Sequence, residues 1–154
     1  MKLVAAADHA AVEMKDEVVQ FLKKQGHQVE DIGPFTKDRV DYPDFAQRAC
    51  QLLVQGECDR VVLVCGSGIG MAMSANKVPG CRAVVIHNSW EAEMSRRHNN
   101  ANVACFGARS MGIELVTSSL LVFLATQFEG GRHTGRVAKM SKLDGSASTD
   151  MLGA

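Results

Sequence analysis

The chain has 154 residues, of which 46% are hydrophobic and 22% charged, as is typical of a single globular domain with a proper core. Seventeen Lys and Arg residues balance seventeen Asp and Glu residues, so no overall charge attracts nucleic acid or an anionic membrane. Aromatic residues make up only 5%, which argues against a base-stacking RNA surface, and no apolar run approaches the length of a transmembrane helix.

Short apolar runs alternate with amphipathic stretches along the whole chain. In chain order, we expect a strand at 2–7, a helix at 10–25, a strand at 28–32, a helix at 44–55, a strand at 60–65, a helix ending near 77, a strand at 81–86, a helix at 89–97, a strand at 103–106, and helices at 114–128 and 132–140. Asp8 is expected to cap the first helix and Gly26 to end it.

This alternation predicts an α/β fold, a single Rossmann-like three-layer domain with a five-stranded parallel sheet. The domain is expected to cover residues 1–140, and the small, polar segment 141–154 is expected to be a mobile tail. Ligands of such sheets bind beyond the carboxyl ends of the strands. That rule directs attention to Asp8-His9, Cys65-Gly66, His87-Asn88 and Arg109, each of which follows a predicted strand.

The glycine-rich segment CGSGIGMAMSANK begins at Cys65. Its glycines allow a tight turn whose N–H groups can surround a phosphate or a developing oxyanion, and the same field favours a thiolate on Cys65. The alternative is a turn that only eases strand–helix packing, with an inert cysteine. Three other kinds of glycine-rich site are excluded. Met71 stands where a cysteine phosphatase needs arginine, and no Gly-Lys-Ser/Thr follows the glycines, as a Walker loop requires. The first strand–helix turn lacks the glycines of a dinucleotide-binding site.

A second candidate site is the basic segment GGRHTGRVAK, in which Arg132 and Arg136 are four residues apart on one predicted helix. Two guanidinium groups in this arrangement suit a dianionic phosphate, although the same pattern also describes a solvated basic helix. Three other residues are equally open to a structural interpretation. Asp8 can be a helix cap, His98 a surface histidine after a helix, and Tyr42 a turn residue before Pro43.

The motifs ADHA, VDYPDFA, CGSGIGM, RRHNNANV, GAR and FEGGRH occur in this order along the chain. Together they resemble the type B ribose-5-phosphate isomerase family, with its galactose-6-phosphate isomerase relatives, over about residues 1–140. The resemblance implies a cytoplasmic enzyme of the pentose phosphate pathway that interconverts D-ribose 5-phosphate and D-ribulose 5-phosphate through a cis-enediolate. It implies no cofactor and no metal, and no cluster of His, Asp and Glu at metal-ligand spacing is evident in the sequence.

The resemblance also implies a role for each matching residue. Cys65 corresponds to the base, Ser67 and Asp8 to residues that move protons between sugar oxygens, and His98 to the residue that opens the furanose ring. The residues implied to bind substrate are His9, Tyr42, Gly66, Gly68, Ile69, Gly70, Asn99, Arg109, Arg132 and Arg136. The chain departs from the family pattern at Ser67, usually threonine, and at Ala11, usually glycine. His87 is left without a secure role.

The resemblance implies a homodimer, or a tetramer, in which His98, Asn99 and Arg109 enter the pocket of the neighbouring chain. The apolar helix expected at 114–128 has little polar face and is a candidate for the contact between subunits. Two alternatives stay open. One is an isomerase of a six-carbon sugar phosphate, such as allose or galactose 6-phosphate, and the other is a sugar-phosphate-binding regulator without turnover. Five cysteines with no CxxC pair fit the reducing cytoplasm.

Overall fold

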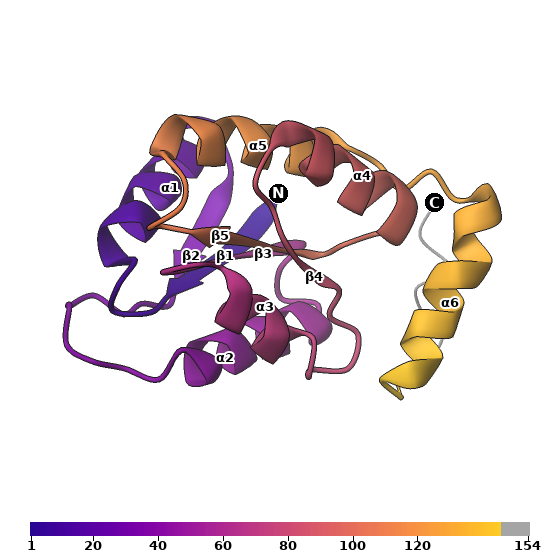
Figure 1. Ribbon diagram of the computed structural model, residues 1–154, viewed down its shortest axis with the longest axis horizontal. Helices are drawn as coiled ribbons and strands as arrows, with labels where there is room; N and C mark the ends of the chain where they lie inside the picture. Colours follow the sequence, from indigo (N-terminus) through magenta and orange to yellow (C-terminus); the bar gives the residue numbers. More distant parts are fainter. Residues whose placement is uncertain (146–154) are drawn as a thin grey trace.

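A parallel sheet of five strands lies at the centre of the molecule in the order β2-β1-β3-β5-β4 (Figure 1). This computed structural model describes residues 1–145. The strands are β1 (Lys2–Ala7), β2 (Gln28–Asp31), β3 (Arg60–Cys65), β4 (Ala83–Val85) and β5 (Val103–Gly107). β3 and β5 are almost completely buried because helices cover both faces of the sheet, and this explains their unbroken apolar sequences.

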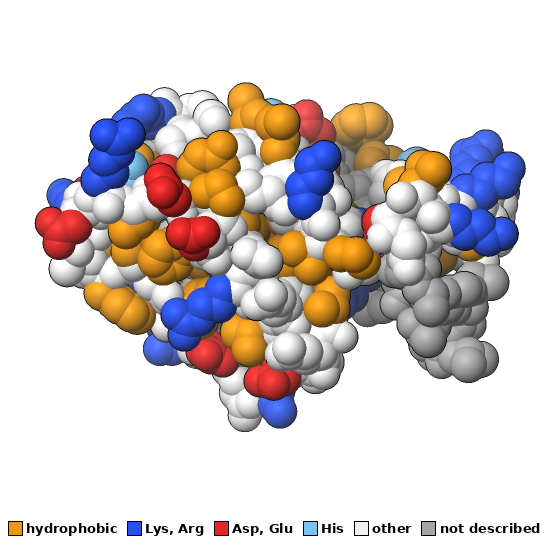
Figure 2. Space-filling view, turned by 90° about the horizontal axis from the view of Figure 1, so that it is seen from below, with side chains coloured by type: hydrophobic (Ala, Val, Ile, Leu, Met, Phe, Trp, Pro, Cys, Tyr) orange, Lys and Arg blue, Asp and Glu red, His pale blue; other side chains and the backbone are white. Residues whose placement is uncertain are grey.

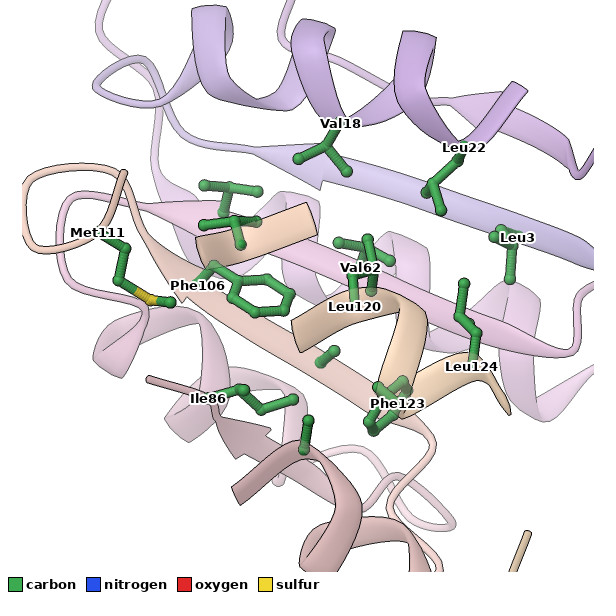
Figure 3. Close-up of a cluster of buried hydrophobic side chains, with 14 of the residues drawn as sticks. Leu3, Val18, Leu22, Val62, Ile86, Phe106, Met111, Leu120, Phe123 and Leu124 are labelled. Carbon is green, nitrogen blue, oxygen red and sulfur yellow. The ribbon is translucent and has the colours of Figure 1, made fainter. Parts of the chain in front are cut away.

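Two helical layers enclose the sheet, with α1, α4 and α5 on one face and α2 and α3 on the other (Figure 1). Successive strand residues point to opposite faces, so each strand contributes to two separate cores. Figure 3 shows the first core, in which Phe106 and Val62 pack against side chains of α1 and α5. The helices are α1 (Val12–Lys24), α2 (Tyr42–Val54), α3 (Ile69–Ala75), α4 (Ser89–Asn99), α5 (Ile113–Ala125) and α6 (Thr134–Leu143), with a 3₁₀ turn at Gly131–His133.

The second core, between the sheet and helices α2 and α3, contains all five cysteines. Cys65 is the last residue of β3, so its side chain points to this face at the carboxyl edge of the sheet. The chain moves outward from β1 to β2 and then returns to β3 on the other side of β1. β1 and β3 therefore flank the topological switch point, which is where ligands of open α/β sheets bind.

The predicted fold class and the order of the elements are confirmed, and the differences lie at the ends of elements. β4 has only three paired residues instead of 81–86, because an edge strand pairs with a single neighbour, β5. α4 runs two residues further than expected and includes His98 and Asn99, whereas α5 ends at Ala125 rather than 128.

One predicted cap was wrong, and α2 begins two residues earlier than expected. Asp8 does not cap α1, whose N-cap residue is Ala11; its Oδ1 accepts the N–H of Ala10 in the preceding turn. Tyr42 is the first residue of α2 rather than a turn residue before it. α6 continues through Leu143, three residues into the segment 141–154 expected to be a mobile tail, and residues 146–154 lie outside the described part. Within residues 1–145, each helix is too short or too polar to cross a membrane.

Candidate functional site

Cys65 lies at the carboxyl end of the central strand β3, directly before the glycine-rich turn. The N–H of Gly68 donates a hydrogen bond to Cys65 Sγ at 3.1 Å, and the N–H of Ile69 donates to Ser67 Oγ at 3.3 Å. The other N–H groups in the first turn of α3 have no intrahelical acceptor. The turn therefore supplies one sulfur and several donors that can stabilise an oxyanion beside it.

Glycine is required at position 68 for two reasons. Its φ of +78° lies in the left-handed region, and a Cβ there would lie 3.1 Å from the backbone carbon of Phe106 and 3.2 Å from Val85 Cγ1. The glycine-rich turn is thus pressed against β5 and β4, which fixes its N–H groups rigidly. The glycine-rich turn therefore both eases strand–helix packing and provides donors, because the close packing is what makes the N–H groups rigid.

Asp8 and His9 follow β1, at the strand adjacent to Cys65 in the sheet. The N–H of Asp8 donates to Val64 O at 3.1 Å, which ties the ends of β1 and β3 together. His9 Nδ1 accepts the N–H of Val40 at 3.4 Å, and this contact places the proton of a neutral ring on Nε2. The Nε2–H group can then donate to an anion.

The ring of Tyr42 lies against Gly70 in the glycine-rich turn. A Cβ on Gly70 would come within 2.8 Å of two ring carbons and 3.3 Å of the phenol oxygen. Tyr42 is about 40% exposed, so the other side of the ring faces outward, where a sugar can contact it. The start of α2 thus forms a wall of the candidate site.

Arg109 belongs to the same edge of its own chain. Its Nη1 would lie 3.4 Å from a Cβ on Gly66, and its backbone N–H donates to Gly66 O at 3.0 Å. The short turn after β5 holds Arg109 beside Gly66 of its own chain, whereas the resemblance implied that it enters the pocket of a neighbouring chain. We call Asp8, His9, Tyr42, the turn from Cys65 to Gly70, and Arg109 the carboxyl-edge group.

His98 and Asn99 lie at the opposite edge of the sheet, because α4 runs back from the end of β4 to the start of β5. Val61 pairs with Val103 and Cys65 with Gly107, so four residues, roughly 13 Å of strand, separate the two edges. Arg132 and Arg136 follow α5 and lie at this amino edge as well. We call His98, Asn99, Arg132 and Arg136 the amino-edge group.

Three consecutive residues of α4 hold the chain that follows α5. The buried Arg96 donates to the backbone oxygens of Ala101 and Thr126, and burial lowers its pKa to about 10. Arg97 donates from Nε and Nη2 to Glu129 Oε2 at 3.1 and 2.9 Å, which lowers the pKa of that carboxyl. His98 stacks on His133, with ring centroids 4.3 Å apart and planes at 10°.

His98, Glu129 and His133 each offer one ligand atom within 4.8 Å of the others, a group that the sequence did not suggest. The stacked rings direct their nitrogen lone pairs in parallel planes, so a cation about 2.0–2.1 Å from both nitrogens would require one ring to turn. Arg97 already pairs with Glu129, and Arg132 Nε lies 3.3 Å from His133 Nε2. Two guanidinium groups make this cluster better suited to an anion.

Burial, with the charges of His98 and Arg132, lowers the pKa of His133 below its usual value. His133 is only 4% exposed and stays neutral at neutral pH, where it packs against His98 without adding charge. Sequence reasoning did not identify His133, Glu129 and Arg97 as site residues. The spacing of four between Glu129 and His133 was the available signal, but both lie outside a regular α-helix.

Arg132 and Arg136 are exposed, and Figure 2 shows Lys and Arg side chains gathered at the end of the molecule formed by α6. Arg132 lies in the 3₁₀ turn before α6 rather than on one helix with Arg136, as the spacing had suggested. A cavity of about 630 Å³ lies nearby, at the amino edge between α6 and the start of β4, and Asn99 lines it. The cavity is not lined by Cys65.

His87 has a structural contact. Its N–H donates to Glu91 Oε2 at 2.7 Å, while Asn88 Oδ1 accepts the N–H of Glu91 at 2.9 Å. The two bonds close the start of α4 reciprocally. His87 is therefore part of a helix cap at the carboxyl end of β4.

Comparison with known proteins agrees with this arrangement. The model of the family described as ribose/galactose isomerase matches residues 3–140. Ribose-5-phosphate isomerase B of Escherichia coli is 38% identical over 143 residues, 93% of this chain and 96% of that protein. The solved structure of ribose-5-phosphate isomerase B from Clostridium thermocellum superposes with a TM-score of 0.93 at 42% identity and covers 94% of this chain and 98% of the other. The structure of a ribose 5-phosphate isomerase from Thermotoga maritima superposes with a TM-score of 0.90 at 40% identity and covers 92% of this chain and 97% of the other. The resemblance seen in the sequence is thereby confirmed, and the chain belongs to the ribose/galactose isomerase family.

Proposed function

We propose that the chain is an aldose–ketose isomerase that interconverts D-ribose 5-phosphate and D-ribulose 5-phosphate, a reaction of the pentose phosphate pathway. The observation that carries this proposal is the position of Cys65 Sγ, which accepts the Gly68 N–H at the mouth of a donor-lined turn. Isomerisation needs a base beside donors for the oxyanion that forms on the neighbouring carbon. This turn supplies both.

The reaction follows from that geometry. Cys65, as the thiolate, removes the proton from sugar carbon 2, and the electron pair forms the double bond to carbon 1 while the negative charge moves to oxygen 1. The N–H groups of the glycine-rich turn stabilise this enediolate. Asp8 and Ser67 transfer the proton from oxygen 2 to oxygen 1. Cys65 then returns its proton to carbon 1 as carbon 2 becomes the ketone.

Ring opening and part of phosphate binding are assigned to the amino-edge group of a second chain. One chain alone separates His98 from Cys65 by the length of a strand, whereas a two-fold dimer can bring the amino edge of each subunit to the carboxyl edge of its partner. In this homodimer, His98 opens the furanose ring beside Asn99. Ile69 and Met73 of α3 are 56% and 64% exposed and offer apolar surface close to the site.

The phosphate is assigned to four cationic or donor residues from both groups. His9 and Arg109 come from the carboxyl edge, and Arg132 and Arg136 from the amino edge of the partner. Charge-assisted hydrogen bonds from guanidinium groups suit a dianion. The five cysteines are all free, which fits an enzyme of the reducing cytoplasm.

The function is tested by incubating the purified protein with D-ribose 5-phosphate in heavy water and following the carbon-bound protons by NMR. Exchange at carbon 2 together with formation of ribulose 5-phosphate supports the proposal. Faster turnover of allose 6-phosphate or galactose 6-phosphate would identify a six-carbon isomerase instead. Binding without exchange would identify a sugar-phosphate-binding regulator.

Chelation is expected to leave the activity unchanged. The N–H donors of the glycine-rich turn supply the stabilisation that a metal ion would otherwise give to the oxyanion. The measurement is kcat after prolonged dialysis against EDTA, with a sample dialysed against buffer alone as the control. Loss of activity that magnesium or manganese restores would contradict the mechanism and would draw attention to His98, Glu129 and His133.

Replacement of Arg136 by alanine is expected to raise KM for the sugar phosphate about ten- to a hundredfold, because a charge-assisted hydrogen bond contributes about 1.5–3 kcal/mol. Unphosphorylated ribose, a very poor substrate, should be little affected. Lys139→Ala is the matched control, since Lys139 is another exposed cation on α6. Equal losses on both sugars in Arg136→Ala would show that the residue acts on the structure and not on the phosphate.

A further inference from the structure

Lys15 is a fully buried lysine on the first turns of α1, with no exposed side-chain surface. Its Nζ lies 2.5 Å from Asp31 Oδ2 and 2.8 Å from Asp16 Oδ1, and 5.0 Å from the centre of the Phe35 ring. Burying an ammonium group is unfavourable unless it is fully paired, and an apolar side chain would fill the same space without that cost. The buried ammonium group of Lys15 is therefore expected to have a role in holding its carboxylate partners in position.

Asp31 ends β2 and connects Lys15 to the loop that begins at Ile32. The second oxygen of the same carboxylate, Oδ1, accepts the N–H of Gly33 at 2.9 Å. Gly33 O in turn accepts the N–H of Ala7 at 3.0 Å, at the last residue of β1. The ammonium group thus fixes the first turn of the loop against the strand that leads into Asp8.

The far end of the loop contacts the carboxyl-edge group and leads into it. The N–H of Val40 donates to His9 Nδ1, and Tyr42 follows two residues later with its ring on Gly70. Between the two ends, Phe35 lies over the Lys15 ammonium group. A second ion pair, Lys37 with Glu13 at 2.6 Å, also joins the loop to α1, but its side chains are 69% and 76% exposed. Exposed pairs of this kind contribute little.

We propose that Lys15 is a positioning residue that, through Asp31, sets the path of loop 32–41 and thereby the place of the Tyr42 ring over Gly70. Without the ammonium group, the Asp31 carboxylate is left half-buried with a missing partner and turns outward, and the Gly33 N–H loses its fixed acceptor. The loop then no longer delivers Tyr42 to the same point. The consequence for the sugar rests on the proposed function, whereas the consequence for Tyr42 does not.

The test uses the fact that Tyr42 is the only tyrosine in the chain. Protein labelled with 3-fluorotyrosine gives a single ¹⁹F environment that reports the position of this ring in the full-length protein. Lys15→Met is expected to shift and broaden the resonance and to raise KM for D-ribose 5-phosphate roughly tenfold, with kcat within about threefold of wild type. Lys15→Arg, which keeps the charge, should restore most of the wild-type resonance and most of the wild-type KM. Lys37→Met should change neither the resonance nor the KM.

Asp31→Asn gives a second variant of nearly unchanged size and should move the resonance in the same direction as Lys15→Met. A wild-type resonance and KM in either folded variant, whatever the loss in Tm, would show that the pair only stabilises the fold and would overturn the proposal. If the wild-type protein does not turn over D-ribose 5-phosphate but the resonance still shifts in both variants, the positioning role stands and the proposed function fails.

Discussion

The Cys65→Ala enzyme is expected to fold normally, to bind inorganic phosphate as the wild type does, and to isomerise at least roughly a hundredfold more slowly, the usual contribution of a general base. The change removes the sulfur that accepts the Gly68 N–H while leaving the glycine-rich turn in place. The measurements are kcat on D-ribose 5-phosphate, circular dichroism, and phosphate affinity by competition. Turnover near the wild-type rate in the folded variant would exclude Cys65 as the base.

Cys58→Ala is the matched control for this result. Both cysteines are free and buried in the core between the sheet and α2 and α3, so both variants lose one buried sulfur from the same cluster. Cys58 lies before β3, at the amino edge, and has no part in the proposed mechanism. A comparable loss of kcat in both variants would assign the effect to packing.

Alkylation by iodoacetamide should identify the same residue. Only a thiolate reacts at a useful rate, and burial raises the pKa of Cys58 to about 11 and raises that of Cys105 further above its usual value. The hydrogen bond with Cys50 lowers the pKa of Cys81, but Cys81 is buried before β4, away from the proposed site. We expect inactivation of the wild type to follow modification of Cys65, and phosphate or substrate to slow it. Inactivation that no ligand slows would point to one of the other cysteines.

The strongest sequence signals in this chain are local, and they predicted the central elements well. RVVLVC predicts a buried strand by its β-branched residues alone, and the structure places it at the centre of the sheet. β4 was overestimated because the apolar character of 81–86 extends beyond the part that has a strand to pair with. The end of α4 was underestimated because Asn100, in the left-handed conformation, ends the helix two residues later than the polar pattern suggests.

The carboxyl-edge residues could be predicted for a physical reason: each follows a strand, and parallel strands end at one edge of the sheet. The partners that lie far apart in the sequence could not be predicted. Lys15 with Asp31, and Arg97 with Glu129, join segments that only the packed fold brings together, and nothing in either local pattern marks the pair. The place of Arg109 beside Gly66 could not be predicted for the same reason, since it depends on the register between β3 and β5.

Refolding Cys65→Ala together with His98→Ala is expected to restore activity that neither variant has alone. The two residues lie at opposite edges of one chain, so in the proposed dimer each site takes Cys65 from one subunit and His98 from the other. Random pairing makes half of the dimers mixed, and each mixed dimer has one site with both residues intact, so about a quarter of all sites should recover. The measurement is the activity of the refolded mixture, compared with each variant refolded by itself.

The structure supplies a matched negative control for this experiment. Arg109 lies beside Gly66 of its own chain, so a mixture of Cys65→Ala with Arg109→Ala should contain no site in which both residues are intact, and it should show no recovery. Recovery in the first mixture and not in the second would show that His98 acts in the site of the partner subunit and that Arg109 acts in the site of its own chain. Activity in the first mixture no higher than the average of its two components would mean that His98 serves a pocket within one chain, and the assignment of the amino-edge group to the partner would then be wrong. Recovery in the second mixture would mean instead that Arg109 leaves Gly66 when the dimer forms.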